Sequence, residues 1–350
     1  MSKQVELNPG DNILISRTDK LGDLILALPF VETIKVRYPE CRVDVLTSLY
    51  ASPILENNPR IDRIVRVQND QLLIDKLYKK DLLYRIRQGD YKVVVALYPE
   101  RQISHLFNKA EIPTRIGTSG RFHSVFFNVH LIHSRKANKK HEYEYNLDFL
   151  QFFKYGETIY KPQVYLVDKE INNAYRILSN VGIKDKFVVL HPGTKGSAEQ
   201  WPIGSFLDLY QMLEKSGLDV VISGSEGEGA KIGEVANRKG IKIRDITGET
   251  DLRTLAAVLS LATVVVANST GPLHLSAAVG TRVVGLYPVK KIMSPRRWGP
   301  VGKYHKVIQP PLPFCQCPSG QCKCMESIDV NNVFDQVIDT FNLTTVWKLL

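Results

Sequence analysis

The sequence predicts an α/β protein of two domains, each built on a mainly parallel β-sheet. The chain has 350 residues, which is more than one hydrophobic core usually serves. Short runs rich in β-branched residues alternate with longer segments of helical periodicity, and this alternation starts again near residue 186. We therefore expect domains at residues 1–160 and 161–325, and a helical segment at 326–350 that packs back on the first domain.

The first half begins with a strand, a helix and a second strand. Residues 12–17 and 42–48 are short apolar runs, and residues 22–38 between them carry apolar side chains at helical spacing. Further strands are expected at 62–67 and 91–98, further helices at 71–88 and 141–156, and a polar, proline-containing crossing to the second half at 156–170.

The second half repeats this order. Its short apolar runs are again separated by helical segments or by turns rich in glycine and serine. The expected strands begin at 186, 218, 241 and 262, and the expected helices lie near 204–216 and 251–261. Two separate parallel sheets are the simplest account of this pattern.

Composition limits the classes of protein. The hydrophobic content of 44 % is too high for a disordered chain. No apolar run is long enough for a signal peptide or a membrane span, so we expect a cytoplasmic protein without a transmembrane segment. The net charge of +10 suits an anionic partner, which is a nucleic acid, an anionic membrane leaflet or a phosphorylated substrate.

Four of the five cysteines lie within ten residues, at Cys315, Cys317, Cys322 and Cys324. In a cytosolic chain such a cluster indicates metal or redox chemistry more than disulfides. The spacing is not a standard zinc pattern, because zinc ligands usually come in pairs two to four residues apart. A structural zinc is thus the alternative to reduced thiols.

Ligands of doubly wound sheets bind at the carboxyl ends of the strands, so the residues just after each strand are the candidate site. The first such turn is Arg17-Thr18-Asp19-Lys20-Leu21-Gly22-Asp23-Leu24, which places Asp23 at or near a helix N-terminus. An acidic residue there either caps the helix or faces a ligand. Spacing alone leaves both interpretations open.

Two loops of the second half have similar positions. In His191-Pro192-Gly193-Thr194-Lys195-Gly196, small residues let the backbone approach an anion, and Thr194 and Lys195 add a hydroxyl donor and a positive charge. The turn Ser223 to Gly229 contains Glu228, whose carboxylate either accepts hydrogen bonds from ribose hydroxyls or is simply solvated. Neither loop has Walker A or dinucleotide-binding spacing.

The last loop, Asn268-Ser269-Thr270-Gly271-Pro272-Leu273-His274, follows an apolar strand and opens a helix. Backbone amides at the helix start, with the hydroxyls of Ser269 and Thr270, predict a cradle for a diphosphate around Gly271. His274 is either packed in the core or part of this site.

These four loops, in this order, resemble glycosyltransferase family 9, the heptosyltransferases that build the inner core of lipopolysaccharide. The strongest matches are Gly22-Asp23 with Leu28-Pro29, residues 190–193 with Trp201-Pro202, and residues 267–280. The resemblance covers nearly the whole chain. It implies a GT-B fold, in which two Rossmann-like domains face a central cleft, the first binding the acceptor and the second the nucleotide sugar.

The resemblance also implies the reaction. It is the inverting, metal-independent transfer of heptose from ADP-heptose to a Kdo or heptose acceptor, with Asp23 as general base and no cofactor beyond the sugar donor. In the donor site, Thr270 and Gly271 would stabilise the diphosphate with help from Thr194 and Lys195. Glu228 would hold the ribose, and Ser269 and His274 would complete the site.

An anionic acceptor calls for basic residues in the first half. Lys79 and Lys80 lie in a basic segment that is either an ordinary amphipathic helix or an element that meets a lipid-anchored core at the inner face of the cytoplasmic membrane. The other expected acceptor ligands are Arg17, Lys20, Arg101 and Arg115.

Two departures from the family pattern keep alternatives open. Ser269 stands where active members usually carry Asp, and Glu199 and Gln200 stand where they carry a basic residue. The alternatives are a transferase of another nucleotide sugar to a surface glycan or a protein, a nucleotide-sugar epimerase, and a non-catalytic binding protein. Nucleic-acid binding is not expected, because no stripe of interleaved aromatic and basic residues occurs.

Overall fold

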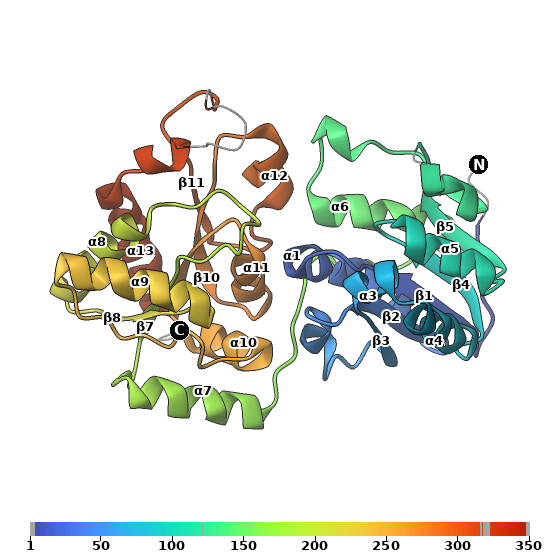
Figure 1. Cartoon of the computed structure of the whole chain (residues 1–350), viewed down its shortest axis with the longest axis horizontal. Helices are drawn as coiled ribbons and strands as arrows, with labels where there is room; N and C mark the ends of the chain where they lie inside the picture. The colour runs from blue at the N-terminus through green and yellow to red at the C-terminus, as the bar shows by residue number, and fades with distance from the viewer. Residues whose placement is uncertain (1–3, 121, 316, 318–322, 348–350) are drawn as a thin grey trace. The chain divides into compact units, whose positions relative to one another are not determined.

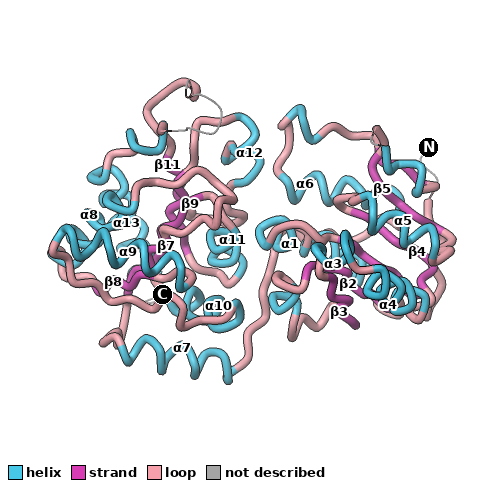
Figure 2. Tube along the Cα trace, in the orientation of Figure 1, coloured by secondary structure: helices cyan, strands magenta, loops and turns pink. Residues whose placement is uncertain are grey.

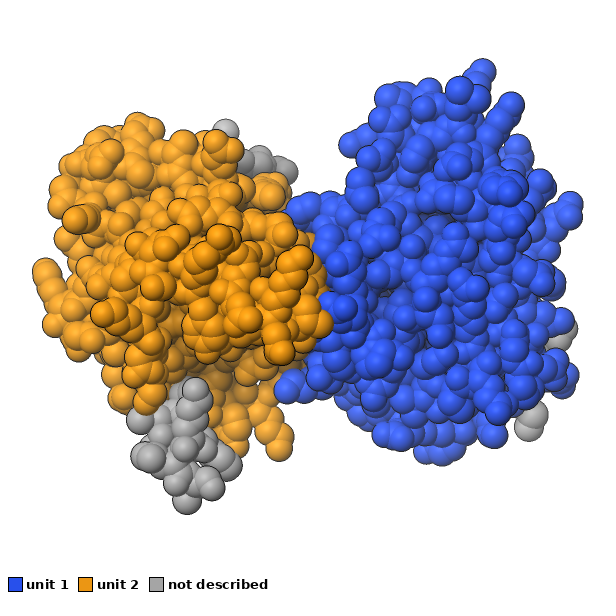
Figure 3. Space-filling view, turned by 90° about the horizontal axis from the view of Figure 1, so that it is seen from below, with its two compact units in different colours: residues 1–165 blue, residues 166–350 orange. Residues whose placement is uncertain are grey.

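The computed structural model describes residues 4–120, 122–315, 317 and 323–347. It divides into two compact units between Tyr165 and Leu166, which are coloured separately in Figure 3. Each unit consists of helices around its own β-sheet (Figure 2). The α/β class with mainly parallel sheets is therefore confirmed, and each unit is described by itself.

The first unit is built on a six-stranded sheet in which every pair of neighbours is parallel. The strand order is β3-β2-β1-β4-β5-β6. Ile13, Leu14 and Ile15 of β1 are fully buried, as expected for a strand covered on both faces. The strands are β1 (Asn12–Ser16), β2 (Arg42–Ser48), β3 (Arg63–Val67), β4 (Tyr91–Ala96), β5 (Thr114–Thr118) and β6 (Val129–Leu131).

Helices cover both faces of this sheet. α4 and α5 lie beside each other on one face, where Leu82 and Leu106 pack with Leu14 and Val94 (Figure 1). α2 joins β1 to β2, packs on β2 and α6, and covers the other face, as right-handed crossovers require. The helices are α1 (Leu21–Ile25), α2 (Leu28–Arg37), α3 (Asn69–Ile74), α4 (Lys76–Arg87), α5 (Arg101–Lys109) and α6 (Glu142–Leu147), with 3₁₀ turns η1 (Ser52–Leu55), η2 (Phe122–Phe126), η3 (Arg135–Ala137) and η4 (Asp148–Phe152).

The second unit has a five-stranded parallel sheet with the order β11-β10-β9-β7-β8. Its strands are β7 (Phe187–His191), β8 (Asp219–Ile222), β9 (Val264–Asn268), β10 (Arg282–Leu286) and β11 (Lys306–Ile308). Its helices are α7 (Asp168–Asn180), α8 (Ile203–Lys215), α9 (Glu226–Lys239), α10 (Leu252–Leu261), α11 (Gly271–Ala278), α12 (Pro295–Trp298) and α13 (Val330–Trp347), with 3₁₀ turns η5 (Lys291–Met293) and η6 (Cys324–Ser327).

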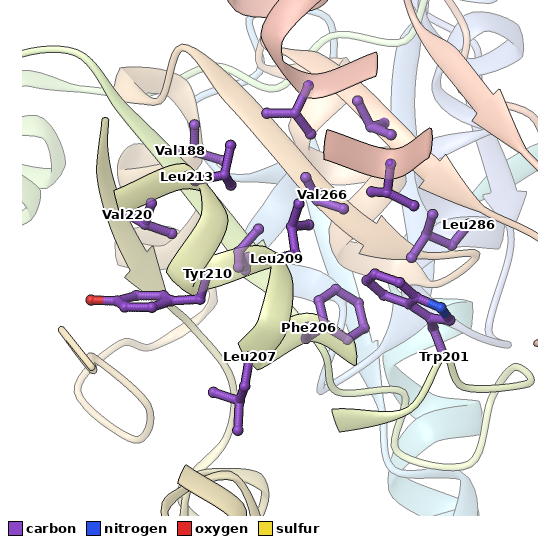
Figure 4. Packing of buried hydrophobic residues seen from close by; sticks show 14 of the residues in the cluster. Val188, Trp201, Phe206, Leu207, Leu209, Tyr210, Leu213, Val220, Val266 and Leu286 are labelled. Atoms are coloured by element: carbon purple, nitrogen blue, oxygen red, sulfur yellow. The ribbon is translucent and has the colours of Figure 1, made fainter. Parts of the chain in front are cut away.

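The core of the second unit lies between its sheet and α8 (Figure 4). Phe206, Leu209 and Leu213 recur at helical spacing, so they share one face of α8, which packs on Val188 and Val266. Trp201 closes the end of this core next to Leu286, and its indole Nε1 donates to the Ile328 carbonyl at 3.1 Å. The loop after β7 is therefore anchored in the core.

The C-terminal helix corrects one expectation. α13 has 18 residues and was expected to pack back on the first domain, but it packs on α8 and on β9, β10 and β11 of the second unit. Val333 and Val337 are fully buried there, because the sheet needs an apolar cover on that face. None of the described helices has both the length and the apolar character that a membrane span needs.

Three expected helices are shorter than predicted. The segment 22–38 breaks between Ile25 and Leu28, and Pro29, which has no N–H to donate, opens α2 where none is needed. The segment 71–88 breaks at Asp75, whose side chain caps α4 by accepting from the Leu77 amide at 2.7 Å. The helix expected at 141–156 ends at Leu147 and continues as a 3₁₀ turn.

The expected strand at 241–248 is reduced to one bridge between Asp245 and Ile222. Conversely, β5, β6, β10 and β11 were not predicted. Two of these, β6 and β11, have three residues each and lie at sheet edges, so their apolar signal is too short to recognise.

Candidate active site

The turn after β1 brings Asp23 to the carboxyl edge of the first sheet. The chain leaves β1 at Ser16, and α1 begins at Leu21 with Lys20 in the N-cap position. Asp23 is therefore the third residue of the helix, in its first turn, and is not the N-cap residue. Its Oδ1 accepts a hydrogen bond from Arg17 Nη2 at 2.5 Å. The carboxylate thus has a fixed orientation that capping does not explain.

Arg17 is the centre of this arrangement. Its side chain is 1 % exposed and contacts Asp19 through Nε at 2.7 Å, Asp23 through Nη2, and Glu142 through Nη1 at 3.1 Å. Burial by itself would lower the pKa of the Arg17 guanidinium, but the attraction of the three carboxylates outweighs burial and raises that pKa. Arg17 was expected to bind the acceptor; because its donors are already engaged, we assign it to holding Asp23.

Helix α6 holds Arg17 from the other side. Glu142 and Asn146 are four residues apart and therefore lie on one face of the helix, and both accept from Arg17 Nη1, the latter at 3.0 Å. Arg135 donates to the same two side chains and also to the Leu97 carbonyl at 3.0 Å. The orientation of Asp23 is thus set by a network of buried ions that reaches across the unit.

Asp19 differs from an ordinary surface aspartate. Burial raises the pKa of its carboxyl to about 7, against the attraction of Arg17 and with the repulsion of Asp23. Two carboxylates beside one guanidinium are not easily both ionised, so Asp19 keeps a proton to higher pH than an exposed aspartate does.

Polar groups of α3 and α5 surround the same edge. Thr18 Oγ1 donates to Glu100 at 2.8 Å, and Asn69 Nδ2 donates to the Thr18 carbonyl at 2.9 Å. The buried atoms Asn69 Oδ1, Gln102 Oε1 and His105 Nδ1 have no hydrogen-bond partner among the described residues. Buried polar atoms are normally satisfied, so these three are available to a hydroxyl-rich ligand.

The expected acceptor ligands do not all meet here. Lys20 and Arg101 are exposed near this edge, and Lys79 and Lys80 lie in the first turns of α4. Arg115 lies near the amino end of β5, where its guanidinium donates to the carbonyls of Ile112 at 2.6 Å and Phe126 at 2.8 Å. Arg115 therefore shapes a loop at the opposite edge of the sheet, and its expected role is corrected.

In the second unit, Asn268 joins the loops that follow β7 and β9. Its side chain is fully buried, accepts from the Trp201 amide at 2.9 Å and donates to the Pro192 carbonyl at 2.8 Å. His191 lies beside it and its Nδ1 is 2.9 Å from Ser223 Oγ. Burial lowers the pKa of His191, so this imidazole is neutral near pH 7.

Glu228 lies beneath the loop formed by residues 192–196. Its carboxylate accepts from the Ser225 amide at 2.9 Å, the Ser225 hydroxyl at 2.7 Å and the Lys195 amide at 3.2 Å. Burial opposes ionisation, but these hydrogen bonds prevail and the pKa of Glu228 is lowered. A Cβ atom at Gly193 would lie 2.2 Å from this carboxyl group, so any other residue there requires the loop or the Glu228 carboxylate to shift.

The start of α11 completes this edge of the second sheet. Thr270 is the N-cap residue, and its Oγ1 bonds to the Asn268 carbonyl at 3.2 Å. The Ser269 amide donates to the Leu286 carbonyl at 3.1 Å. Pro272 has no N–H and the Leu273 amide donates to the Thr270 carbonyl at 3.1 Å, so the helix start offers an anion the amide of Gly271. His274 is buried one turn further on.

A family model describes this chain over residues 80–326, which is more than two thirds of its length. The model is that of glycosyltransferase family 9, the heptosyltransferases. The chain belongs to this family. It is therefore a glycosyltransferase of the heptosyltransferase family, as the four loops predicted.

Relatives of this family 9 chain include an inferred glycosyltransferase of Haemophilus influenzae, 28 % identical, with 93 % of this chain and 96 % of the relative covered. Lipopolysaccharide heptosyltransferase 3 of Escherichia coli is 25 % identical, with 79 % and 82 % covered. The chain therefore spans most of the length of both relatives.

Solved structures agree in fold. A family 9 glycosyltransferase from Veillonella parvula matches with a TM-score of 0.85 and 20 % identity, covering 97 % of this chain and 99 % of that one. ADP-heptose lps heptosyltransferase II of E. coli matches with a TM-score of 0.74 and 19 % identity, covering 95 % and 99 %. The family 9 chain accordingly has the GT-B fold of the heptosyltransferases.

Two features of the family 9 chain remain: Glu199, which differs from the usual family pattern, and the cysteine cluster. Glu199 forms an ion pair with Lys290, so a positive charge reaches this loop from the segment after β10. Of the candidate zinc ligands, Cys322 lies outside the described residues. Within the described ranges, no three His, Cys, Asp or Glu side chains are grouped to hold a metal ion.

Several residues of the site were not predicted: Asn69, Gln102, His105, Glu142, Asn146 and Asn268. Asn268 had a signal, because it is a polar residue that ends an apolar strand. Glu142 and Asn146 contact Arg17 across more than 120 residues of sequence, and no local pattern reveals such a contact.

Proposed function

We propose that the protein transfers a heptose from ADP-heptose to an anionic inner-core lipopolysaccharide acceptor that ends in Kdo or heptose, with inversion and with Asp23 as general base. The observation that carries the proposal is the Asp23 carboxylate held by buried Arg17 at the carboxyl edge of β1. A general base needs a carboxylate in a fixed position, and this one is fixed by a network that reaches α6.

In the transfer step one bond forms at the anomeric carbon and one breaks. An acceptor hydroxyl oxygen attacks the anomeric carbon of the donor while its proton passes to Asp23. The bond from that carbon to the diphosphate oxygen breaks, and ADP leaves with the bonding electrons. The start of α11 at Gly271, with Thr270, Thr194 and Lys195, would stabilise the developing charge on the diphosphate. These groups can carry that charge without a metal ion.

The rest of the donor would contact the loops around Glu228. Its carboxylate is ionised and oriented by Ser225, and it would accept hydrogen bonds from the ribose hydroxyls. Ser269 and buried His274 would complete the site around the sugar. The choice of ADP-heptose is supported by the E. coli structural relative, whose name specifies this donor.

On the acceptor side, Lys20, Lys79, Lys80 and Arg101 would bind the carboxylates or phosphates of the core. The polar atoms of Asn69, Gln102 and His105 would bind sugar hydroxyls. The name of the relative lipopolysaccharide heptosyltransferase 3 supports this class of acceptor. Such an acceptor is anchored in lipid, so the protein would work in the cytoplasm, peripherally on the inner face of the cytoplasmic membrane.

The test is heptose transfer by the purified protein, followed by mass spectrometry of Kdo-terminated and heptose-terminated core acceptors. We expect Asp23→Asn to lower turnover by about a hundredfold or more while ADP affinity in calorimetry stays within about twofold, because an amide cannot act as the base and the loops that would bind ADP belong to the second unit. Asp208→Asn, which changes an exposed aspartate paired with Lys239, is the matched control. Unchanged turnover of Asp23→Asn would remove this residue from the mechanism.

A second candidate is transfer of a different nucleotide sugar to a surface glycan or a protein. It is favoured by Ser269 and by the Glu199–Lys290 ion pair, because both change the charge around the donor relative to the usual family pattern. Calorimetry with ADP, UDP, GDP and CMP separates the two candidates. Selective binding of ADP supports heptose transfer, and preference for another nucleotide supports the second candidate.

A further inference from the structure

Bulky apolar side chains are exposed on α3 and on the first turn of α4. Leu73, Ile74 and Leu77 are 69 %, 79 % and 75 % exposed. The inner faces of these helices are already occupied by Leu72 and Leu82, which are buried in the core of the first unit. Single exposed apolar residues are common on protein surfaces, but three bulky ones within five positions mark an interaction surface.

A second exposed apolar group lies on η2. Phe122 and Val125 are 91 % and 75 % exposed. η2 packs on α5, where the ring centroid of Phe126 is 5.1 Å from that of His105, and α5 packs in turn on α4 (Figure 1). Both groups therefore belong to the face that α4 and α5 cover. We call the five residues Leu73, Ile74, Leu77, Phe122 and Val125 the apolar rim.

Cations lie on α4 and α5, the helices that contact the elements of the apolar rim. Lys76, Lys79, Lys80 and Arg101 form no ion pair with any described residue. Lys79 and Arg101 lie close enough to His105 that, together with burial and Lys109, they lower its pKa. The carboxylates nearest to these cations on α4 already have other partners.

Those acids are Asp75 and Asp81. The first caps α4 through the Leu77 amide, and the second pairs with Arg85 at 2.8 Å. Over residues 69–87, five cations stand against three carboxylates. The surface therefore joins exposed apolar groups to positive charge that its own carboxylates leave unpaired.

We infer that the apolar rim docks on an anionic phospholipid bilayer, with its apolar side chains in the headgroup region and Lys76, which the proposed function does not assign to the acceptor, on lipid phosphates. Leucine and phenylalanine beside lysine are the composition of interfacial membrane segments. A second copy of this chain is disfavoured, because two surfaces with unpaired lysines would meet in a protein whose net charge is already +10.

This inference rests on the proposed function for its purpose, because a lipid-anchored acceptor is presented at a bilayer. The apolar rim is also adjacent in the fold to the turn that carries Asp23. Asn69 is the first residue of α3 and binds the Thr18 carbonyl in the turn that carries Asp23. A bilayer docked on α3 and η2 would therefore lie next to the edge of the sheet where the base is held.

The test is co-sedimentation of the full chain with vesicles of phosphatidylcholine alone or of phosphatidylcholine mixed with anionic phosphatidylglycerol. We expect binding to the anionic vesicles only, weakened at high salt. The variant Leu73→Ser/Ile74→Ser/Leu77→Ser should lose about tenfold or more in vesicle affinity, and Lys76→Glu about fivefold or more. Circular dichroism checks that the variants are folded.

Matched controls change similar residues on the second unit. Tyr175→Ser on α7 removes another exposed bulky side chain, and Lys231→Glu on α9 reverses another exposed lysine. Both should bind anionic vesicles like the wild type. Equal losses in all four variants, or no binding of the wild type, would overturn the inference. A wild-type dimer that the triple variant makes monomeric, without vesicle binding, would also overturn it.

The outcomes also separate this inference from the proposed function. If the wild type binds ADP and transfers heptose to a deacylated, soluble acceptor but ignores vesicles, the docking surface is wrong and the enzyme assignment stands. If it binds vesicles but uses no ADP-heptose, the assignment is wrong and the docking surface stands. When both hold, the triple variant should lose activity on acceptor in vesicles and keep it on the soluble acceptor.

Discussion

At the scale of single residues, Arg17 determines the charge of its surroundings. One guanidinium faces the carboxylates of Asp19, Asp23 and Glu142, and its side chain is almost fully buried. A buried charge is tolerated only when it is paired, so each member of this group depends on the others. The same pairing that keeps Asp23 in one orientation therefore makes the turn after β1 sensitive to substitution.

Replacement of Arg17 by methionine should be severely destabilising. The substitution removes the cation and leaves three carboxylates with reduced compensation, so we expect Arg17→Met to lower the free energy of unfolding by about 3–5 kcal/mol in urea titrations. Arg85→Met breaks a partly exposed pair with Asp81 and should cost about 1 kcal/mol or less. Similar small losses in both variants would contradict the central role of Arg17.

Asp19 should make stability depend on pH. Its pKa rises from 3.8 to about 7 on folding, so between these values the folded chain binds more protons than the unfolded chain. Stability of the wild type therefore falls as pH rises through this window, and Asp19→Asn lacks that loss. Measured by urea unfolding, the stability of Asp19→Asn relative to wild type should increase by about 1–2 kcal/mol from pH 4.5 to 7.5. A constant difference would contradict it.

At the scale of elements, the candidate site of each unit consists of loops and first helical turns at the carboxyl ends of parallel strands, held by a buried side chain from elsewhere in the same unit. Arg17 is held by Glu142 of α6, and the loop after β7 is held by Asn268 at the end of β9. Each anchor satisfies its buried hydrogen-bonding groups within its own unit. The ligand-facing groups can therefore be rigid although they lie on loops.

The sequence predicted those elements whose structure depends on residues close together in the chain. The apolar β-branched runs of β1, β2, β4, β7 and β9 and the loops after them could be predicted, which is why Asp23 and Thr270 could be placed at the ends of strands. The break before Pro29 and the cap at Asp75 had local signals that the apolar spacing concealed. The anchoring of Arg17 by α6 could not be predicted, because it joins segments that meet only in the folded unit.

Gly193 should be essential for the donor loop. A Cβ there would approach the Glu228 carboxyl group to 2.2 Å, so Gly193→Ala must displace either the loop or the carboxylate. We expect a loss of about 1–3 kcal/mol in stability and a weakening of ADP binding by about tenfold. Gly227→Ala is the matched control, because a Cβ at that helical position meets nothing within 4 Å. Its stability should be unchanged or slightly higher. Unaltered ADP binding by Gly193→Ala would show that this close approach is not needed.

At the scale of the whole molecule, each unit has its own sheet and its own core. Leu14 and Val94 pack with α4 and α5 in the first, while Val188 and Val266 pack with α8 and α13 in the second. α13 supplies Val333 and Val337 to the second core alone. Stability should therefore be divided between two cooperative units, and the nucleotide should stabilise the unit that binds it.

If the two units unfold separately, a core substitution in the second unit and the binding of ADP should shift the same unfolding transition in opposite directions. Val337→Ala removes fully buried methyl groups from the second core and should lower one transition in a calorimetric scan, by about 1–3 kcal/mol. ADP at about 100 times its Kd should raise that same transition by about 2.7 kcal/mol. Val94→Ala, in the first core, should lower the other transition and leave the ADP-sensitive one in place. If both substitutions and ADP shift one common transition, the two units do not unfold independently, and substitutions in the core of one unit must then be expected to weaken the other as well.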